Sequence, residues 1–271
     1  MLYILTLTWN ACDKLSKLKE SLIPALQDIP YKWIIKDNDS KDNTLEVASQ
    51  WGPDVHIIKY KNNLQNFSEG MNLLFNEANP KDDDTILLLN NDVVFNDKTS
   101  LRDMNNILNK KDIGVVGARL LFTNTNKLQH AGVVFEKRGP THFRSGEMSD
   151  PQAEKNRLFQ VVTGAVILTK ADTFKNVCTT NKSGIGGLDE NYHWAFDDVD
   201  FCLSIKYNLK KNIVYCGKTN ISHEESASLK KNPVNKMFMG HNFNLLKSKW
   251  NGRIIADADL YKDNKYNLFN G

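Results

Sequence analysis

Three carboxylates stand within four positions in the stretch FDDVDF, residues 196–201. Apolar residues follow at three- and four-residue spacing, which predicts an amphipathic helix with Asp197 or Asp198 as its N-cap. Acids in the first turn stabilise a helix through its dipole by about 0.3–1 kcal/mol, so a structural role accounts for one or two of them. Phe196 and Trp194 would shield a neighbouring carboxylate from water, and a shielded carboxylate suits a general base. Both interpretations stay open from this stretch alone.

A second feature pairs a carboxylate with an imidazole. Asp92 ends the run TILLLNND, and a carboxylate after a buried strand suits a hard divalent cation bound to phosphates. The alternative is a turn closed by its own side-chain hydrogen bonds. His223 follows another apolar run and taken alone is more often structural than a ligand, but its presence beside Asp92 in the motif set favours a metal site. The stretch DNDS (37–40) is either a capped strand-to-helix turn or a set of acceptors for a base or ribose.

Several common chemical motifs are missing from the sequence. No GxxxxGK[ST] occurs, and no GxGxxG follows the first apolar run, so glycine-rich phosphate loops are excluded. No GxSxG or HExxH occurs either, which argues against acyl-transfer hydrolases and zinc proteases. What remains is a nucleotide held by carboxylates, amides and a metal ion.

The first third of the chain must position these residues. Strand-like apolar runs alternate with helical spacing, and four strands linked by helices predict a parallel sheet whose ligands bind beyond the carboxyl ends of the strands. Pro24 should kink or end the first helix early. We expect strands at 2–8, 32–37, 56–60 and 85–90, and helices at 15–26, 42–51 and 68–78.

The rest of the chain is less regular. Apolar patterns predict further strands, a polar loop, a short helix and a final amphipathic helix. The strands are expected at 114–122, 130–137, 158–169 and 212–217, the loop at 141–156, and the helices at 171–177 and 233–250. The last segment carries aromatic residues beside lysines, which suits a packed C-terminal helix or, alternatively, a peripheral membrane or dimer contact.

Composition sets limits on partners and location. The formal net charge of +3 on 271 residues is too small to predict nucleic-acid binding by charge alone. The four cysteines show no CxxC spacing, and the first residues show neither a basic n-region nor a cleavage site. We therefore expect a cytoplasmic protein, with contact at the inner membrane face as an alternative.

The motifs together resemble the family 2 glycosyltransferases, inverting enzymes of the GT-A fold. LTLTWN is similar to the family's opening strand and turn, IKDNDSKDNT to its nucleotide motif, NFSEGMN to a following element, and LLLNNDVVF to its DxD segment. LQHAGVVF, VVTGAVIL, GGLDENYHWAFDDVDFCL and HEESAS resemble its acceptor side. The implied architecture is one α/β GT-A domain over 1–271 with a mostly parallel central sheet, a smaller acceptor-side sheet and a C-terminal helix. Its parts are a nucleotide-sugar half (1–97), an acceptor and catalytic half (98–232) and a helical tail (233–271).

The resemblance also implies roles for single residues. Asp198 is the expected base, Asp197 orients acceptor or donor sugar, and Asp200 is mainly structural. Asp92 and His223 are the expected ligands of Mn²⁺ or Mg²⁺. Phe196 and Trp194 are expected at the acceptor, and the residues expected at the nucleotide sugar are Thr8, Trp9, Asn10, Asp37, Asn38, Asp39, Asn66, Asn91 and Gly164.

The implied activity is transfer of a hexose or deoxyhexose from a UDP- or dTDP-sugar to a hydroxyl of a glycan or lipid-linked glycan in cell-surface polysaccharide synthesis. A protein or modified nucleic-acid acceptor is the alternative with the same chemistry. A sugar-phosphate nucleotidyltransferase would need a glycine-rich basic loop after the first strand, where TWNACDK has no glycine. A module that binds nucleotide or glycan without turnover is the remaining alternative.

Overall fold

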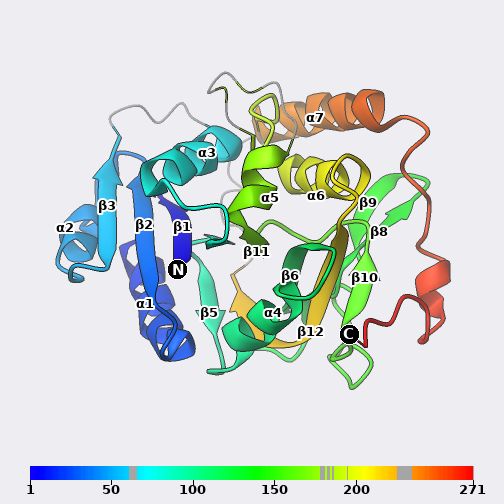
Figure 1. Ribbon diagram of the computed structural model, residues 1–271, viewed down its shortest axis with the longest axis horizontal. Coiled ribbons are helices and arrows are strands. Elements are labelled where there is room, and N and C mark those ends of the chain that lie inside the picture. The colour runs from blue at the N-terminus through cyan, green and yellow to red at the C-terminus, as the bar shows by residue number, and fades with distance from the viewer. Residues whose placement is uncertain are drawn as a thin grey trace.

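The computed structural model describes residues 1–60, 66–177, 181, 184, 186–193, 195–224 and 234–270 (Figure 1). Within these residues one ten-stranded sheet has the order β10-β12-β6-β11-β4-β1-β2-β3, with β5 beside β12 and β7 beside β6, and β8 and β9 form a separate hairpin. The strands are β1 (Leu2–Thr8), β2 (Tyr31–Asp37), β3 (Val55–Lys59), β4 (Thr85–Leu89), β5 (Val93–Phe95), β6 (Ile113–Phe122), β7 (Leu128–His130), β8 (Val133–Glu136), β9 (Gly139–His142), β10 (Arg157–Phe159), β11 (Val166–Lys170) and β12 (Asn212–His223). The helices are α1 (Cys12–Leu26), α2 (Thr44–Ser49), α3 (Phe67–Ala78), α4 (Ser100–Leu108), α5 (Ala171–Asn176), α6 (Asp197–Tyr207), α7 (Val234–Trp250) and the 3-10 turn η1 (Leu260–Lys262).

The first four strands form the predicted parallel sheet. β1 pairs in parallel with β2 and β4, and β2 pairs in parallel with β3. The register sets Thr8 opposite Asp37, so the loops after β1 and β2 leave the sheet at the same edge. The predicted fold class, a mostly parallel central sheet flanked by helices with a smaller separate sheet, is confirmed.

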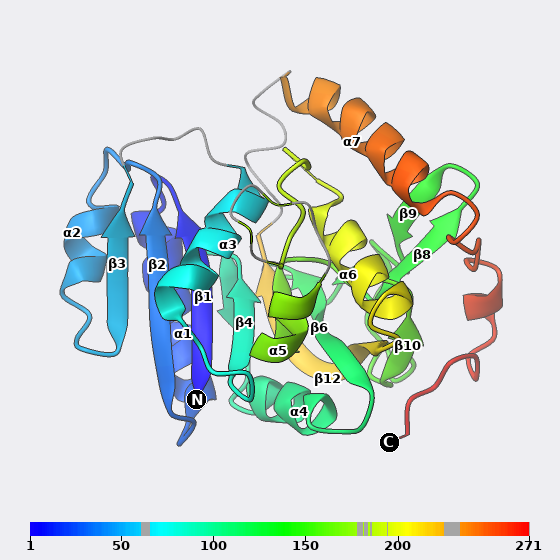
Figure 2. The ribbon, with the colours of Figure 1, turned by 45° about the horizontal axis from the view of Figure 1, so that its top comes forward.

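Helices cover both faces of the sheet, because successive strand residues point to opposite sides. Leu5, Ile34 and Leu88 pack with α3, α5 and α6, whereas Ile4, Trp33 and Leu87 pack with α1 and α4. Figure 2 shows α3, α5 and α6 together on one side of the strands. The alternation therefore produces two apolar layers with the sheet between them.

Pro24 does not end α1 early, as the sequence had suggested. The helix runs on to Leu26, with Pro24 inside its last turn. A proline at this place removes one late backbone hydrogen bond, while Leu22, Ala25 and Leu26 stay buried against the sheet. Their burial holds the final turn in helical form.

Two strands that the sequence predicted as continuous are interrupted. The segment 158–169 divides into β10 and β11, and the segment 130–137 divides at Gly132. Gly132 has φ 109°, a backbone conformation that other residues rarely adopt, and its carbonyl accepts from Phe143 N at 2.9 Å. Apart from Leu158, which is partly buried, the apolar residues of both segments are buried, so the hydrophobic pattern did not reveal the breaks.

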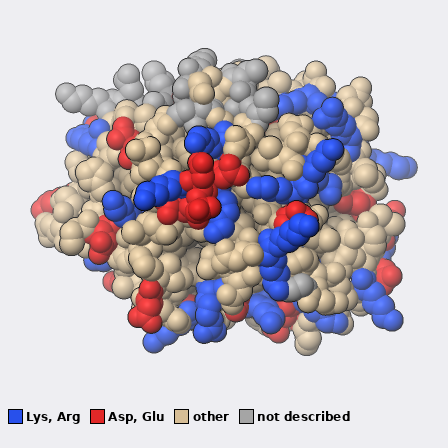
Figure 3. Space-filling model, viewed as in Figure 1, with Lys and Arg blue, Asp and Glu red and all other residues tan. Residues whose placement is uncertain are grey.

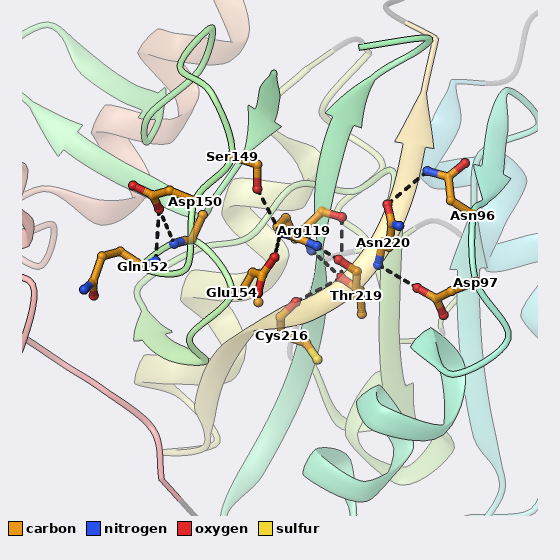
Figure 4. A network of polar contacts seen from close by, with 12 residues as sticks. Asn96, Asp97, Arg119, Ser149, Asp150, Gln152, Glu154, Cys216, Thr219 and Asn220 are labelled. Atoms are coloured by element: carbon orange, nitrogen blue, oxygen red, sulfur yellow. Dashed lines mark hydrogen bonds and ion pairs between the residues drawn. The ribbon is translucent and has the colours of Figure 1, made fainter. Parts of the chain in front are cut away.

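β12 is longer than predicted and carries a bulge. Its register against β6 shifts between Cys216 and Ile221, after which residues 221–223 also pair with β5. Arg119 on β6 holds the bulge, donating from Nε to Thr219 O at 2.8 Å, and Thr219 Oγ1 donates to Cys216 O at 2.9 Å (Figure 4). The bulge thus allows β12 to continue to His223 with its backbone groups bonded.

α7 packs against the body of the protein near α6 (Figure 1). Leu246 and Trp250 are almost fully buried, in agreement with the packed C-terminal helix considered from sequence. Lys249 Nζ lies 2.8 Å from both Asp200 Oδ2 and Asp189 Oδ2, and Trp250 Nε1 donates to Asp200 Oδ1 at 2.7 Å. Asp200 is fully buried, so these contacts tie α7 to the start of α6.

Lys249→Met should lower the free energy of unfolding by about 3 kcal/mol, because it leaves two buried carboxylates without their cation while keeping the aliphatic stem. Urea unfolding followed by circular dichroism measures the loss. Lys247→Met on the same helix is the matched control; Lys247 lies over the Phe243 ring at 4.4 Å, and its loss should cost at most about 1 kcal/mol. Equal effects of the two substitutions would contradict a structural role for the Lys249 contacts.

Candidate active site

A cleft of about 500 Å³ brings together segments that are far apart in the sequence. It lies where β4 and β12 end and α6 begins, and the β8–β9 hairpin and α7 contribute further walls. Open α/β sheets bind their ligands at the carboxyl ends of the strands. The lining residues include Phe67, Asn90, Pro140, Thr141, His142, Thr163, Gly164, Phe196, Asp197, Asp198, His223 and Met239.

Asp198 is partly buried at this cleft, in the first turn of α6. Its Oδ2 accepts from Gly164 N at 2.8 Å and its Oδ1 accepts from Val199 N at 2.8 Å. Burial raises the pKa of Asp198 above its ordinary value, while the Gly164 hydrogen bond and the nearby His142 ring act in the opposite direction. The outcome is a carboxylate of increased basicity in a fixed orientation, which is what a general base requires.

Asp197 is more deeply buried than Asp198 and also lines the cleft. Burial, followed by the adjacent charge of Asp198, raises the pKa of Asp197 to about 7. Two neighbouring carboxylates in a place of low polarity oppose each other's ionisation. The ionisation of Asp197 therefore depends on whether Asp198 is charged.

The turn before α6 has an unusual backbone. Ala195 and Phe196 have φ of 62° and 69°, in the left-handed region that non-glycine residues seldom occupy. Asn242 on α7 donates to Ala195 O at 3.1 Å, and the Phe196 ring lies 5.7 Å from the Phe243 ring of α7. Contacts with α7 thus hold this turn in its strained form.

The sequence expectation for the helix start is wrong in one respect. Phe196 occupies the N-cap position without a side-chain cap, and Asp197 and Asp198 are the first residues inside α6. Phe196 does line the cleft, as expected for an acceptor-binding residue, but that role stays a prediction. Trp194, the other expected acceptor residue, lies outside the residues that the structure describes.

The two expected metal ligands lie side by side. β5 and β12 pair antiparallel with His223 opposite Val93, which places His223 Nε2 3.1 Å from Asp92 Oδ1. Asn90 Nδ2 lies 3.4 Å from the same imidazole nitrogen. Lys14 Nζ, at the start of α1, is 3.9 Å from Asp92 Oδ2. Asp92 and His223 are thus adjacent at the end of the sheet, and His223 faces the same cleft as Asp198.

The hydrogen bonds of His223 test whether this pair fits a cation. Gln129 Nε2 donates to His223 O at 3.2 Å, so its Oε1 is the atom that lies 2.7 Å from His223 Nδ1 and accepts a proton from it. Nε2 of the neutral ring then presents a lone pair toward the Asp92 carboxylate. The lone pairs of His223 Nε2 and Asp92 Oδ1, 3.1 Å apart, need a proton or a cation between them. Metal-binding histidines typically donate from their other ring nitrogen to an oxygen, as His223 Nδ1 does to Gln129 Oε1.

Two protein ligands do not complete a metal site. In the part of the chain that the structure describes, no cluster of three or more His, Cys, Asp or Glu residues is arranged to hold a metal ion. Mg²⁺ and similar ions often take one or two protein ligands and fill the other positions with substrate phosphates and water. The donor set therefore fits an ion that is bound together with a phosphate-containing substrate.

Most of the residues expected at the nucleotide sugar lie at or after the ends of β1, β2 and β4, whereas Asn66 caps α3 and Gly164 lies before β11, bonded to Asp198. Asn91 Nδ2 donates to Thr8 Oγ1 at 3.2 Å, and Asn38 N donates to Thr8 O at 2.9 Å. Asn10 N donates to Ser40 Oγ at 2.8 Å, which joins the loops after β1 and β2. The Trp9 side chain is 54% exposed beside them. These loops form one surface, and their contact with a nucleotide stays a prediction.

Asp37 differs from its neighbours because it is fully buried. Both of its carboxylate oxygens accept from Ser40, one from the backbone N at 3.0 Å and the other from Oγ at 2.5 Å. In this structure Asp37 shapes the loop on which Asn38 and Asp39 lie. Asp39 is more exposed than Asp37, and its Oδ2 lies 2.5 Å from Lys41 Nζ. A direct contact of Asp37 with a base stays a prediction.

Asn66 also has a structural task. Its Oδ1 caps α3 by accepting from Glu69 N at 2.8 Å, and its Nδ2 donates to Glu190 O at 2.8 Å. These bonds link α3 to the segment that precedes α6. The expected contact of Asn66 with the nucleotide sugar stays a prediction.

Four residues near the site were not identified from sequence. Gln129 and His130 come from β7, His142 from β9, and Lys14 from α1. Gln129 and His130 lie in LQHAGVVF, a segment that resembles the family's acceptor side, but no role was expected for either of them; His142 and Lys14 lie outside the recognised motifs. Only the pairing of distant segments brings them beside Asp92, Asp198 and His223.

Comparison with known proteins identifies the family. The family model "Glycosyl transferase family 2" matches residues 3–174, more than half of the chain, and the chain belongs to this family. The solved structures most similar in fold include S. aureus TarS 1–349 in complex with UDP-GlcNAc, with a TM-score of 0.62 and 13% identity over 95% of this chain and 68% of that one. GalNAc-T7 with UDP, GalNAc and Mn²⁺ has a TM-score of 0.64 and 10% identity over 84% of this chain and 44% of that one. The fold is accordingly the GT-A glycosyltransferase fold.

A third structure and the curated relatives extend the comparison. The mannosyltransferase PcManGT from Pyrobaculum calidifontis, in complex with GDP-Man and Mn²⁺, has a TM-score of 0.61 and 12% identity over 97% of this chain and 70% of that one. The O-antigen biosynthesis protein RfbC of Myxococcus xanthus is 27% identical over 72% of this chain and 15% of its own length. The uncharacterized protein y4gI of Sinorhizobium fredii (strain NBRC 101917 / NGR234) is 26% identical over 64% of this chain and 19% of its own length. The matches with these two relatives thus cover less than a fifth of their length.

Asp197→Asn should stabilise the fold at high pH. A folded pKa of about 7 lies above the ordinary value of 3.8, so the contribution of Asp197 to stability is fully present below pH 3.8 and is lost as pH rises through 7. The advantage of the uncharged variant should grow by about 2–3 kcal/mol from pH 5 to pH 8. Urea unfolding with chelator at both pH values measures it. The exposed Asp28→Asn is the control and should change stability little at either pH; an equally small effect of Asp197→Asn would show that Asp197 ionises freely in the folded state.

Proposed function

We propose that this chain is an inverting glycosyltransferase that moves a hexose or deoxyhexose from a nucleotide-diphosphate sugar to a hydroxyl of a glycan. One observation carries the proposal: Asp198, held by Gly164 N, faces the same cleft as His223, which lies 3.1 Å from Asp92. A base and a pair of residues able to hold a divalent cation, on one cleft, suit a single displacement in which a diphosphate leaves a sugar carbon. Membership of glycosyl transferase family 2 supports the reaction class.

The chemical step follows from the roles of these residues. The acceptor oxygen attacks the anomeric carbon, its proton passes to Asp198, and the bond from that carbon to the diphosphate breaks. The electron pair of that bond leaves with the nucleoside diphosphate. The configuration of the anomeric carbon is inverted, because the acceptor attacks on the side opposite the departing diphosphate. A glycosidase would need a second acid to protonate its leaving group, whereas a diphosphate leaves as a stabilised anion.

Asp92 and His223 would hold the divalent ion, with Gln129 fixing the imidazole tautomer. When bound, such an ion supplies positive charge that neutralises the departing diphosphate. Mn²⁺ or Mg²⁺ is the expected ion, and GalNAc-T7 and PcManGT were each solved with Mn²⁺ and a nucleotide or nucleotide sugar. Lys14, 3.9 Å from Asp92, adds a second cation beside the same position.

The donor and acceptor follow from the comparisons and the surface. The complexes of TarS with UDP-GlcNAc and of GalNAc-T7 with UDP favour a UDP-linked donor, with a dTDP-linked donor as the alternative. RfbC, named for O-antigen biosynthesis, favours a cell-surface glycan, free or lipid-linked, as acceptor. On the face drawn in Figure 3 an acidic patch interrupts the lysines and arginines, and a continuous basic surface is what nucleic-acid binders present. We therefore favour a glycan over a nucleic acid.

The remaining expectations concern location and organisation. No helix in the described ranges has the length and apolar character needed to cross a membrane. A cytoplasmic location, a contact with the inner membrane face, a homodimer, and the division at positions 97 and 232 stay predictions.

Asp198→Asn should reduce turnover by about 10²–10⁴-fold, because it removes the base while its amide oxygen still accepts from Gly164 N. The assay is release of nucleoside diphosphate from a panel of UDP-, dTDP- and GDP-sugars with Mn²⁺. Donor affinity, measured by calorimetry, should change by less than about threefold. Asp28→Asn controls for loss of a carboxylate. Unchanged turnover in Asp198→Asn would remove Asp198 from the role of base, and saturable donor binding with neither release nor transfer in the wild type would favour a binding module.

Asp92→Asn should raise the Mn²⁺ concentration for half-maximal turnover by at least about tenfold, and excess Mn²⁺ should restore part of the rate. Gln129→Leu, which leaves both ligands in place but frees the imidazole, should give a smaller shift in the same direction. A Mn²⁺ titration of donor hydrolysis, started from chelator-treated protein, measures both. Full activity in chelator would show that the pair holds a proton and that the reaction needs no metal.

A further inference from the structure

A lysine that the chemical step does not use lies between two carboxylates at the end of the sheet. Lys14 stands in the first turn of α1, and its Nζ is 3.9 Å from Asp92 Oδ2 and 3.3 Å from Glu224 Oε2. Glu224 N donates to Asp92 O at 3.0 Å, so the two acids are adjacent. Lys14 thus reaches from α1 to the segments that carry the proposed metal ligands.

These ion pairs are not what holds α1 against the sheet. The side chains of Lys14 and Glu224 are 30% and 54% exposed, and exposed ion pairs contribute little to stability because water and salt weaken them. Leu15, Leu18 and Leu22, which are almost fully buried, fix the helix instead. Lys14 can therefore change partners at little cost to the fold.

The two oxygens of Asp92 face different groups. Oδ1 is 3.1 Å from His223 Nε2, where the divalent ion is proposed, and Oδ2 faces Lys14. A positive charge this close to a ligand oxygen opposes the approach of a second cation. Asn90, whose Nδ2 is 3.4 Å from the same imidazole nitrogen, adds no negative charge. We therefore expect the pair to bind a divalent ion weakly when no phosphate is present.

A diphosphate would change this balance of charge. An ion with so few protein ligands completes its coordination with phosphate oxygens, which then also lie close to Asp92. The flexible four-carbon stem of Lys14 brings its ammonium group within reach of such oxygens. A diphosphate carries more negative charge than either carboxylate and competes with them for that group. Once Lys14 turns to the diphosphate, Asp92 loses a competing cation and can hold the ion more tightly.

We propose that Lys14 is a diphosphate-binding residue that makes the nucleoside diphosphate and the divalent ion bind together. In the free protein it pairs with Asp92 and Glu224 and weakens binding of the ion alone. When the donor binds, the Lys14 ammonium group donates to the diphosphate, and Asp92 becomes available to the ion. The inference rests on the proposed nucleotide-sugar donor and metal pair.

Direct binding measurements test this coupling without turnover. Electron paramagnetic resonance gives the Kd of Mn²⁺ alone, and calorimetry gives the Kd of UDP, dTDP and GDP in chelator and at saturating Mn²⁺. Wild-type protein is compared with Lys14→Met, which keeps the aliphatic side chain without its charge, and with Lys14→Arg, which keeps the charge. Lys17→Met, at an exposed position of the same helix, is the control.

Lys14→Met should bind Mn²⁺ alone at least about threefold more tightly, because no cation competes at Asp92. In chelator it should bind the preferred nucleoside diphosphate at least about threefold more weakly, because a charge-assisted contact is lost. The factor by which Mn²⁺ tightens nucleotide binding should fall at least about threefold, since coupling between two ligands is reciprocal. Lys14→Arg should keep most of the coupling, and Lys17→Met should behave as the wild type.

The outcomes separate this inference from the proposed function. Wild-type protein that binds none of the nucleoside diphosphates, with or without Mn²⁺, would refute the nucleotide-sugar function and the inference with it. Nucleotide binding with the same Mn²⁺ coupling in Lys14→Met as in the wild type would leave that function intact and overturn the role of Lys14. An equal loss of nucleotide affinity in Lys14→Met and Lys14→Arg, with Mn²⁺ affinity unchanged, would show a structural role only.

Discussion

The cost of removing carboxylates from water governs the start of α6. Asp197, Asp198 and Asp200 lie within one helical turn, and each has a different environment. Asp200 is fully buried and is offset by Lys249 and the Trp250 indole, which makes it a structural anchor. The same acid type therefore serves structure or chemistry according to the partners that the fold provides.

Among the residues that the structure describes, Asp200 has a lysine partner, whereas Asp198 and Asp197 have none. Backbone N–H groups hold Asp198 in place without cancelling the effect of burial on its pKa. The pKa of Asp197 is raised by burial and, in addition, by the adjacent charge of Asp198. Burying Asp197 and Asp198 lowers the stability of the fold. The contacts of α7 with Ala195 and Asp200 offset part of this loss.

The two halves of the site are built on different principles. On the nucleotide side, regular parallel strands end at one edge, and the loops after β1 and β2 are joined by short polar contacts such as Asn10 to Ser40. On the proposed acceptor side, the cleft is shaped by irregular backbone: the break before β11, the bulge in β12 and the left-handed turn before α6. Each irregularity frees or redirects backbone groups, and the freed Gly164 N donates to Asp198, the proposed base.

Sequence pattern determined the strands and helices of the first half, the helix that begins at FDDVDF, and the residue types of the proposed base and the candidate metal pair. These features are local, since burial of alternate or every third to fourth residue leaves a periodic trace in the chain. The breaks at Gly132 and Gly164, the N-cap at Phe196 and the setting of His130 and His142 were decided only by tertiary structure. His130 is bonded to Thr163, 33 positions away, and Gln129 to His223, 94 positions away. Such contacts satisfy buried polar groups across the sheet, and no local periodicity records which distant residue will supply the partner.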